Sequence, residues 1–290
     1  MSIIIGTFIT MGVLGIAFGL GLAIVSDRFA VKIDPRVEKI IEVLPGANCG
    51  ACGLAGCSDF AKAVAEGRAP VSGCTVGQED VARLIANIMG VVAEAKEKSV
   101  AVVMCRAKNV VDKFAYEGVS DCRAAALLHG GPKGCEYGCI GLGTCVEACM
   151  FEAMRMGSDG VPEIIEERCT ACGKCAAVCP KALISILPIS KKVHVRCKSL
   201  DKGAVAKKKC GNPCIACKLC EKECPYDAIH VQNFLAVIDY DKCTSCGKCV
   251  LVCPTKIIEN YEGKRVVVVS ASPFKKVKQE DVILSVSKES

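Results

Sequence analysis

The sequence contains no tryptophan, and aromatic residues make up only 4% of its 290 residues. Large aromatic side chains usually anchor a hydrophobic core, so something else must organise much of this chain. No G-x-G-x-x-G segment lies between a strand and a helix, and no G-x-x-x-x-G-K-[ST] loop is present. The chain therefore offers no evident nucleotide-binding site of its own.

Cysteine is abundant instead, with 24 residues. An even number is compatible with disulfide bonds, which form in oxidising compartments. Residues 1–26 help to identify the compartment that holds these cysteines. They contain no charged side chain and are long enough for a membrane-spanning helix. They lack the basic start and the small-residue cleavage site of a secretory signal peptide. We therefore predict a retained transmembrane anchor, with a buried core helix as the alternative interpretation.

The charges near this segment predict its orientation. Asp27, Arg28 and Lys32 follow the segment, and no basic residue precedes it. The positive-inside rule then places the bulk of the chain on the cytoplasmic side of the cell (inner) membrane, with a single pass. Thiols on that reducing side bind metal more often than they pair with each other.

The formal net charge of +6 counts every thiol as neutral. A [4Fe-4S] cluster with four thiolates carries a charge of about −2, so six clusters would bring the total to about −6. The apparent basicity therefore gives no support to a nucleic-acid partner.

The chain after the anchor divides into segments of different composition. Residues 27–46 form a linker with an amphipathic run that Pro45 ends, and residues 47–98 form a compact cysteine-rich unit. In that unit we expect a helix with Ser58 or Asp59 as its N-cap and a second helix from Gln78 to Glu97. From residue 99 on, two similar halves each contain a β-rich strand ending in cysteine, a second lone cysteine and eight more, as in a duplication. The segments predicted there are 99–134, 135–186, 187–213, 214–260 and a tail, 261–290, with two short strands.

The spacing C-x2-C-x2-C-x3-C-P occurs three times, in Cys169–Pro180, Cys214–Pro225 and Cys243–Pro254. This is the bacterial ferredoxin run, in which three thiolates bind one [4Fe-4S] cluster and the fourth binds its neighbour. A zinc site would favour two separated pairs of cysteines. The runs therefore predict [4Fe-4S] clusters.

A fourth group, in the first half, is irregular, with the spacing C-x3-C-x5-C-x3-C and Met150 in place of proline. The repeat gives it the same role, because 19 residues separate its last cysteine from Cys169 and 18 separate Cys224 from Cys243. The predicted ligand sets are Cys135, Cys139, Cys145 with Cys179; Cys169, Cys172, Cys175 with Cys149; Cys214, Cys217, Cys220 with Cys253; and Cys243, Cys246, Cys249 with Cys224.

Eight cysteines lie outside these runs. Four of them, near the N-terminus, have the spacing C-x2-C-x4-C-x16-C and predict a fifth cluster, with a zinc ion as the alternative. The other four, two from each half, form either a sixth cluster or a set of buried structural cysteines. The first set is Cys49, Cys52, Cys57 and Cys74, and the second is Cys105, Cys122, Cys197 and Cys210.

Lysines gather between the two ferredoxin-like modules, at positions 191, 192, 198, 202 and 207–209. They are either a docking surface for an acidic electron carrier or a solvated face.

The uncharged N-terminal segment, the stretch LPGANCGACGLAGC with the distant Cys74, and the CP-terminated runs together resemble the RnfB family of Rnf electron-transport complexes. The resemblance covers nearly the whole chain, and the cysteine count is similar to that of the long clostridial-type form. It implies a membrane complex that oxidises reduced ferredoxin and reduces NAD+, coupled to Na+ or H+ export. This chain would accept electrons from soluble ferredoxin and relay them to partner subunits that hold the flavins, the NAD site and the ion path.

The predicted fold is therefore α+β, with an N-terminal transmembrane helix, a small 4Fe-4S domain and duplicated ferredoxin-like modules. The CGACGLAGC stretch also resembles the cluster domain of corrinoid iron–sulfur proteins and their activators. A membrane-tethered reductive activator is thus the alternative function, although no cobalamin- or ATP-binding segment is evident. A zinc-stabilised scaffold is a third hypothesis and predicts a colourless protein.

Overall fold

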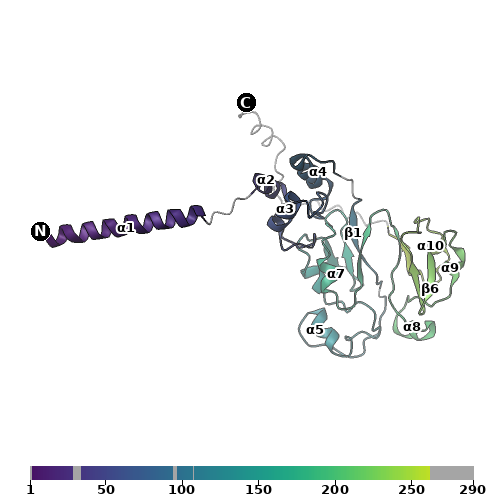
Figure 1. Ribbon diagram of the computed structural model, residues 1–290. Coiled ribbons are helices and arrows are strands. Elements are labelled where there is room, and N and C mark those ends of the chain that lie inside the picture. The colour runs from purple at the N-terminus through teal and green to yellow at the C-terminus, as the bar shows by residue number, and fades with distance from the viewer. Residues whose placement is uncertain (1, 29–33, 94–96, 107, 262–290) are drawn as a thin grey trace. The chain divides into compact units, whose positions relative to one another are not determined.

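The computed structural model describes residues 2–28, 34–93, 97–106 and 108–261, whose helices and strands are shown in Figure 1. They form two compact units. The first contains the described residues up to Ser99 together with Thr170–Lys174, and the second contains Val100–Cys169 and the described residues from Cys175 onward. The two strands predicted in the C-terminal tail fall at positions outside the described residues.

The first unit begins with helix α1 (Ser2–Arg28). Its described side chains are mostly apolar and exposed, among them Met11, Phe18 and Leu22. Among the residues that the structure describes, no helix combines the length and the apolar character needed to cross a membrane.

Three helices form the core of the first unit: α2 (Pro35–Val43), α3 (Cys57–Ala65) and α4 (Gln78–Met89). Helix α2 begins after Asp34, whose side chain accepts a hydrogen bond from the Arg36 backbone N–H, and proline occupies its first turn. The apolar faces of the helices meet at Ile40, Phe60 and Ile85, each at most 2% exposed.

Two helix boundaries differ from the prediction. Helix α3 begins at Cys57, and its N-cap is Gly56 rather than Ser58 or Asp59. Helix α4 ends at Met89 rather than Glu97, because Gly90 adopts the left-handed conformation (φ +67°) that commonly ends a helix.

The two halves of the second unit repeat one order of elements: strand, helix, helix, hairpin, helix, strand. The first half comprises β1 (Ser99–Val103), α5 (Cys122–Leu127), α6 (Thr144–Glu147), β2 (Met154–Met156), β3 (Pro162–Ile164), α7 (Lys174–Val178) and β4 (Ile184–Pro188). The second half comprises β5 (Val193–Val195), α8 (Gly203–Lys209), α9 (Leu219–Glu223), β6 (Ile229–Gln232), β7 (Leu235–Ile238), α10 (Lys248–Leu251) and β8 (Ile258–Asn260).

Strand pairing closes each half on itself. The first and last strands of a half pair with each other, β1 with β4 and β5 with β8. The β5–β8 pair is antiparallel and aligns Val193 with Asn260. The strands between them form antiparallel hairpins, β2–β3 and β6–β7. The β-branched segments VAVV and VHV supply the first strand of each half, consistent with their strand propensity.

Cysteines are part of the hydrophobic cores of both halves. In the first half, Val102 and Leu183 are buried in one cluster with Cys145 and Cys169. In the second half, Val193 and Ile229 are buried in one cluster with Cys214, Cys220 and Cys249. The fold is α+β, and its small cores place many thiols away from water.

Candidate iron–sulfur centres

All 24 cysteines lie in the described part of the chain, and no disulfide bond joins any of them there. Within the same residues, no three Cys, His, Asp or Glu side chains lie close enough together to hold a single metal ion. A [4Fe-4S] cube binds each of four thiolates at a different iron, so its ligands border a larger space than those of one ion. The relevant geometry is therefore a cavity with four cysteines in its wall.

The cysteine set of the first unit lies in the loop before α3, at the first residue of α3 and in the loop after it. Cys52, Cys57 and Cys74 pack against its core, and Cys49 and Cys57 lie close enough to Cys74 to raise its pKa after the larger effect of burial. The Asn48 side-chain oxygen accepts the Cys57 backbone N–H at 2.8 Å and so caps α3 from nine residues away.

Gly56 makes this cap possible. A Cβ atom at residue 56 would lie 2.8 Å from the Asn48 side-chain oxygen. The glycine therefore leaves room for the Asn48 side chain beside the first turn of α3.

One cavity in the second half is lined by Cys224, Cys243, Cys246 and Cys249. This is the set that the ferredoxin spacing predicts: three closely spaced cysteines with one from the neighbouring run. Burial, followed by the nearby Cys243 and Cys224, raises the pKa of the Cys249 thiol to about 11. A bound cluster would require the thiolate form and would offset this cost through the iron–sulfur bond.

The corresponding cavity in the first half is lined by cysteines other than the predicted set. It is lined by Cys122, Cys139, Cys145 and Cys179. Cys179, the fourth cysteine of its run, lines this cavity as predicted. Cys122 occupies the position expected for Cys135. Burial is the main cause that raises the pKa of Cys139 to about 12 and that of Cys145 to about 11.

Cys122 reaches this cavity from the start of α5. The Asp121 side chain caps that helix by accepting the backbone N–H groups of Arg123 and Ala124. The Cys122 backbone N–H donates to the Thr144 hydroxyl at 2.7 Å, which fixes the start of α5 against the turn that precedes Cys145.

The sequence contains a signal for the presence of Cys122, rather than Cys135, in this cavity. Cys139, Leu142, Cys145 and Cys149 have the same spacing as the run Cys214, Cys217, Cys220, Cys224, with leucine in place of the second cysteine. Leu142 packs against the small cluster that contains Cys122. Cys122, from a distant point in the sequence, thus lines the cavity beside the run that lacks its second thiol.

The remaining ferredoxin-type cysteines lie around the two cores. Cys214 and Cys220 are buried in the core of the second half, and Cys253 packs against it. Burial, then Cys214 and Cys217, raises the pKa of Cys220 to about 12. In the first half, Cys169 and Cys175 are buried and Cys149 packs against them, whereas Cys172 belongs to the segment that groups with the first unit.

A third cavity of the second unit is lined by Cys105, Cys135, Cys197 and Cys210. It contains three of the four cysteines that the sequence suggested for a sixth site. Cys122 is absent from its wall, and Cys135 is present.

Family comparisons agree with the cysteine geometry. Residues 44–76 match the model of a putative Fe-S cluster, and residues 138–183 and 213–258 each match a 4Fe-4S dicluster domain. A Methanosarcina acetivorans protein, named as the B subunit of an ion-translocating oxidoreductase complex, is 45% identical over 89% of this chain and 98% of its own length. The chain belongs to the B-subunit family of ion-translocating oxidoreductase complexes.

Two further members of this family carry more specific names. The Acetobacterium woodii relative is named as the B subunit of a Na+-translocating ferredoxin:NAD+ oxidoreductase complex and is 45% identical over 86% of this chain and 75% of its own length. The Clostridium ljungdahlii relative belongs by name to a proton-translocating complex of the same kind and is 44% identical over 89% of this chain and 93% of its own length.

Backbone N–H groups point at several sulfur atoms in this family member. The N–H of Ala153 lies 3.3 Å from the Cys149 sulfur, and in the second half the N–H of Ala228 lies 3.3 Å from the Cys224 sulfur. Such donors favour a thiolate over a thiol, and they raise the reduction potential of an attached cluster. The residues present therefore fit thiolate-bound iron–sulfur clusters.

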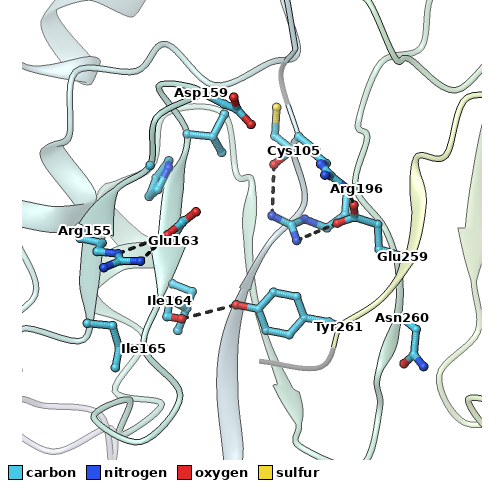
Figure 2. A pocket seen from close by; sticks show the side chains of 14 residues that line it. Cys105, Arg155, Asp159, Glu163, Ile164, Ile165, Arg196, Glu259, Asn260 and Tyr261 are labelled. Atoms are coloured by element: carbon cyan, nitrogen blue, oxygen red, sulfur yellow. Dashed lines mark hydrogen bonds and ion pairs between the residues drawn. The ribbon is translucent and has the colours of Figure 1, made fainter. Parts of the chain in front are cut away.

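A polar pocket lies beside Cys105 in the second unit (Figure 2). Arg155 pairs with Glu163 across the β2–β3 hairpin at 3.0 Å, and Arg196 pairs with Glu259 at 3.4 Å. The Tyr261 hydroxyl, from the second half, donates to the Ile164 carbonyl of the first half at 3.5 Å. The Tyr261–Ile164 hydrogen bond joins the two halves beside this pocket, whereas each of the two ion pairs lies within one half.

Proposed function

We infer that this chain is the membrane-anchored, electron-carrying subunit of an ion-translocating ferredoxin:NAD+ oxidoreductase complex. It accepts electrons from reduced ferredoxin and relays them through [4Fe-4S] clusters to partner subunits. The observation that carries this proposal is the cavity lined by Cys224, Cys243, Cys246 and Cys249, because it reproduces the ligand pattern of a ferredoxin cluster. The names of the relatives supply the complex in which such a relay acts.

Five clusters form the core of the relay. When bound, they supply one-electron transfer without any proton or group transfer by the protein. The protein holds the thiolates, excludes water through its two cores and directs backbone N–H groups at the sulfurs. The proposed ligand sets are Cys49, Cys52, Cys57, Cys74; Cys122, Cys139, Cys145, Cys179; Cys149, Cys169, Cys172, Cys175; Cys214, Cys217, Cys220, Cys253; and Cys224, Cys243, Cys246, Cys249.

Membrane attachment is assigned to residues 1–26. This segment carries no charged side chain, and the described apolar side chains of α1 are exposed. The anchor leaves the cysteine-rich part of the chain on the cytoplasmic side, where soluble ferredoxin and NAD+ are found. The NAD site and the ion path belong to the partner subunits of the complex.

Ferredoxin docking is assigned to the basic end of α8. Lys207 and Lys208 are exposed in its last turn, whereas Lys209 pairs with Asp201 at 2.9 Å. The next residue is Cys210, in the wall of the third cavity. Two exposed lysines beside a candidate redox site suit an acidic electron carrier, because opposite charge raises the encounter rate.

The experiment that tests this function is reduction of the full chain by ferredoxin. The anaerobically purified protein should be brown, with absorbance at about 400 nm that bleaches when reduced ferredoxin is added. A protein that binds iron but takes no electrons from reduced ferredoxin would contradict the proposal. A colourless protein that binds zinc would contradict it as well.

A further inference from the structure

The third cavity takes two cysteines from each half of the second unit. Cys105 follows β1 and Cys197 follows β5, so they occupy equivalent places in the two halves. Cys135 precedes Cys139 by four residues, and Cys210 precedes Cys214 by four. The two halves therefore contribute the same pair of positions to one cavity.

The spacing of the cysteines supports this equivalence. The series Cys135, Cys139, Cys145, Cys149 and the series Cys210, Cys214, Cys220, Cys224 share the pattern C-x3-C-x5-C-x3-C. The matches to the dicluster family begin at residues 138 and 213, after the first cysteine of each series. The first member of each series is thus separate from the ferredoxin module that follows it.

Matching hydrogen bonds occur in the two halves. The Cys139 backbone N–H donates to the Cys105 sulfur at 3.5 Å, and the Cys214 backbone N–H donates to the Cys197 sulfur at 3.5 Å. The Ser199 N–H also points at the Cys197 sulfur, at 3.4 Å. Each of the two strand-end cysteines therefore has a donor that favours its thiolate.

Backbone contacts between the halves hold the walls of the cavity together. The Arg106 N–H donates to the Arg196 carbonyl at 3.0 Å, and the Gly211 N–H donates to the Lys108 carbonyl at 2.8 Å. The first bond joins the residues next to Cys105 and Cys197, and the second brings the residue after Cys210 toward the first half.

The charged side chains in the wall of the cavity are basic: Arg106, Arg196, Lys198 and Lys209. Acidic side chains outside the wall pair with three of them, Glu259 with Arg106 and Arg196, and Asp201 with Lys209. The Arg196 side chain is 11% exposed, and its Nε atom is buried with no hydrogen-bond partner in the described part of the chain. These four cations and two carboxylates carry a net charge of +2. A cluster with four thiolates carries a charge of about −2, which they would balance.

We propose that Cys105, Cys135, Cys197 and Cys210 bind a sixth [4Fe-4S] cluster, which joins the two ferredoxin-like modules. This ligand set replaces the one suggested by the sequence, because Cys122 lines the other cavity with Cys139, Cys145 and Cys179. All 24 cysteines are then used, four for each of six clusters. The inference rests on the proposed electron relay and specifies how electrons cross between its two halves.

The cluster count of the wild-type chain is the first test. Full-length protein, purified anaerobically, should contain about 24 iron atoms and about 24 acid-labile sulfides per chain. A value of about 20 would overturn the sixth cluster and leave the five-cluster relay intact. Reduction by ferredoxin, measured on the same sample, reports separately on the proposed function.

Paired cysteine variants test the ligand sets. The number of intact [4Fe-4S] clusters per chain is measured by Mössbauer spectroscopy, so that a cluster surviving in a three-iron form counts as lost. Cys135→Ala, Cys210→Ala and the double variant C135A/C210A should each lose the same single cluster. C122A/C210A should lose two. The reverse result, two clusters lost in C135A/C210A and one in C122A/C210A, would overturn the assignment.

Leu142→Cys tests whether a restored thiol can replace Cys122 or Cys135. It restores the complete ferredoxin spacing at residues 139, 142, 145 and 149. L142C should therefore return the lost cluster to Cys122→Ala but not to Cys135→Ala. Rescue of Cys135→Ala by L142C would show that Cys135 belongs to the ferredoxin module and would contradict the proposal.

Discussion

Thr144 accepts the backbone N–H of Cys122 through its hydroxyl at 2.7 Å, across 22 residues of sequence. Thr144 is 6% exposed, so water does not readily replace it as an acceptor. Together with the Asp121 cap, this bond fixes the start of α5, which carries Cys122, the proposed cluster ligand from outside the ferredoxin run. Its removal should therefore affect one cluster more than the others.

Thr144→Ala is expected to destabilise the chain by about 1–3 kcal/mol, because it leaves the buried Cys122 N–H without an acceptor. It should also accelerate iron loss from one cluster to a chelator. Thr144→Ser keeps the hydroxyl and serves as the control. Equal rates of iron loss in wild type and Thr144→Ala would show that this bond does not position Cys122.

Gly56→Ala is expected to destabilise the N-terminal cluster site. The new Cβ would lie 2.8 Å from the Asn48 side-chain oxygen and would displace the cap on Cys57. Asn48→Ala removes the same cap without crowding, at an expected cost of about 1 kcal/mol. Chelator-induced iron release measures both effects. If neither variant releases iron faster than wild type, the cap has no part in holding this site.

Lys207→Glu combined with Lys208→Glu should slow reduction by ferredoxin. We expect a decrease of about tenfold in the second-order rate constant at low salt, shrinking as ionic strength rises. The double variant Lys39→Glu/Lys62→Glu makes the same change in net charge on α2 and α3 of the first unit, and is the control. Stopped-flow absorbance gives the rate constants, and equal slowing by both pairs would mean that net charge, rather than docking at α8, sets the rate.

His194 should make stability depend on pH. Burial, followed by the nearby Arg196, lowers its pKa to about 4. The unfolded chain thus takes up this proton at higher pH than the folded chain, so the stabilising contribution is complete above about pH 6.5 and is lost as pH falls toward 4. Its ring Nδ1 atom, 2.8 Å from the Tyr240 hydroxyl, lies in a site that holds the neutral form.

Between pH 7 and pH 5, wild type should lose about 2 kcal/mol more free energy of unfolding than His194→Gln. Anaerobic guanidinium denaturation of both proteins at the two pH values measures the difference. Because both carry the same clusters, acid sensitivity of the clusters affects both alike. Parallel losses in the two proteins would rule out His194 as the titrating group.

Features that depend on residues close together in the sequence can be predicted from the spacing of those residues. Three cysteines in seven residues reach one space, and the set at Cys224, Cys243, Cys246 and Cys249 follows from the spacing alone. The repeated order of elements also follows from the repeated cysteine pattern. The start of α2 was predictable for the same reason, because Asp34 and Pro35 act on adjacent residues.

Contacts between distant residues are harder to predict. Cys122 and Cys135 are both lone cysteines ahead of a run, and only the comparison of Leu142 with Cys217 separates their roles. The end of α4 depended on the conformation of Gly90, which the apolar periodicity does not report. The third cavity required two strand ends and two loops from different halves to meet.

The measurement that tests the relay most directly is a redox titration of the full chain with reduced ferredoxin, combined with iron quantitation on the same sample. Each [4Fe-4S] cluster takes up one electron, so a relay of six clusters should contain about 24 iron atoms and accept about six electrons per chain. A chain that contains this iron but accepts no electrons from ferredoxin would contradict the proposed relay.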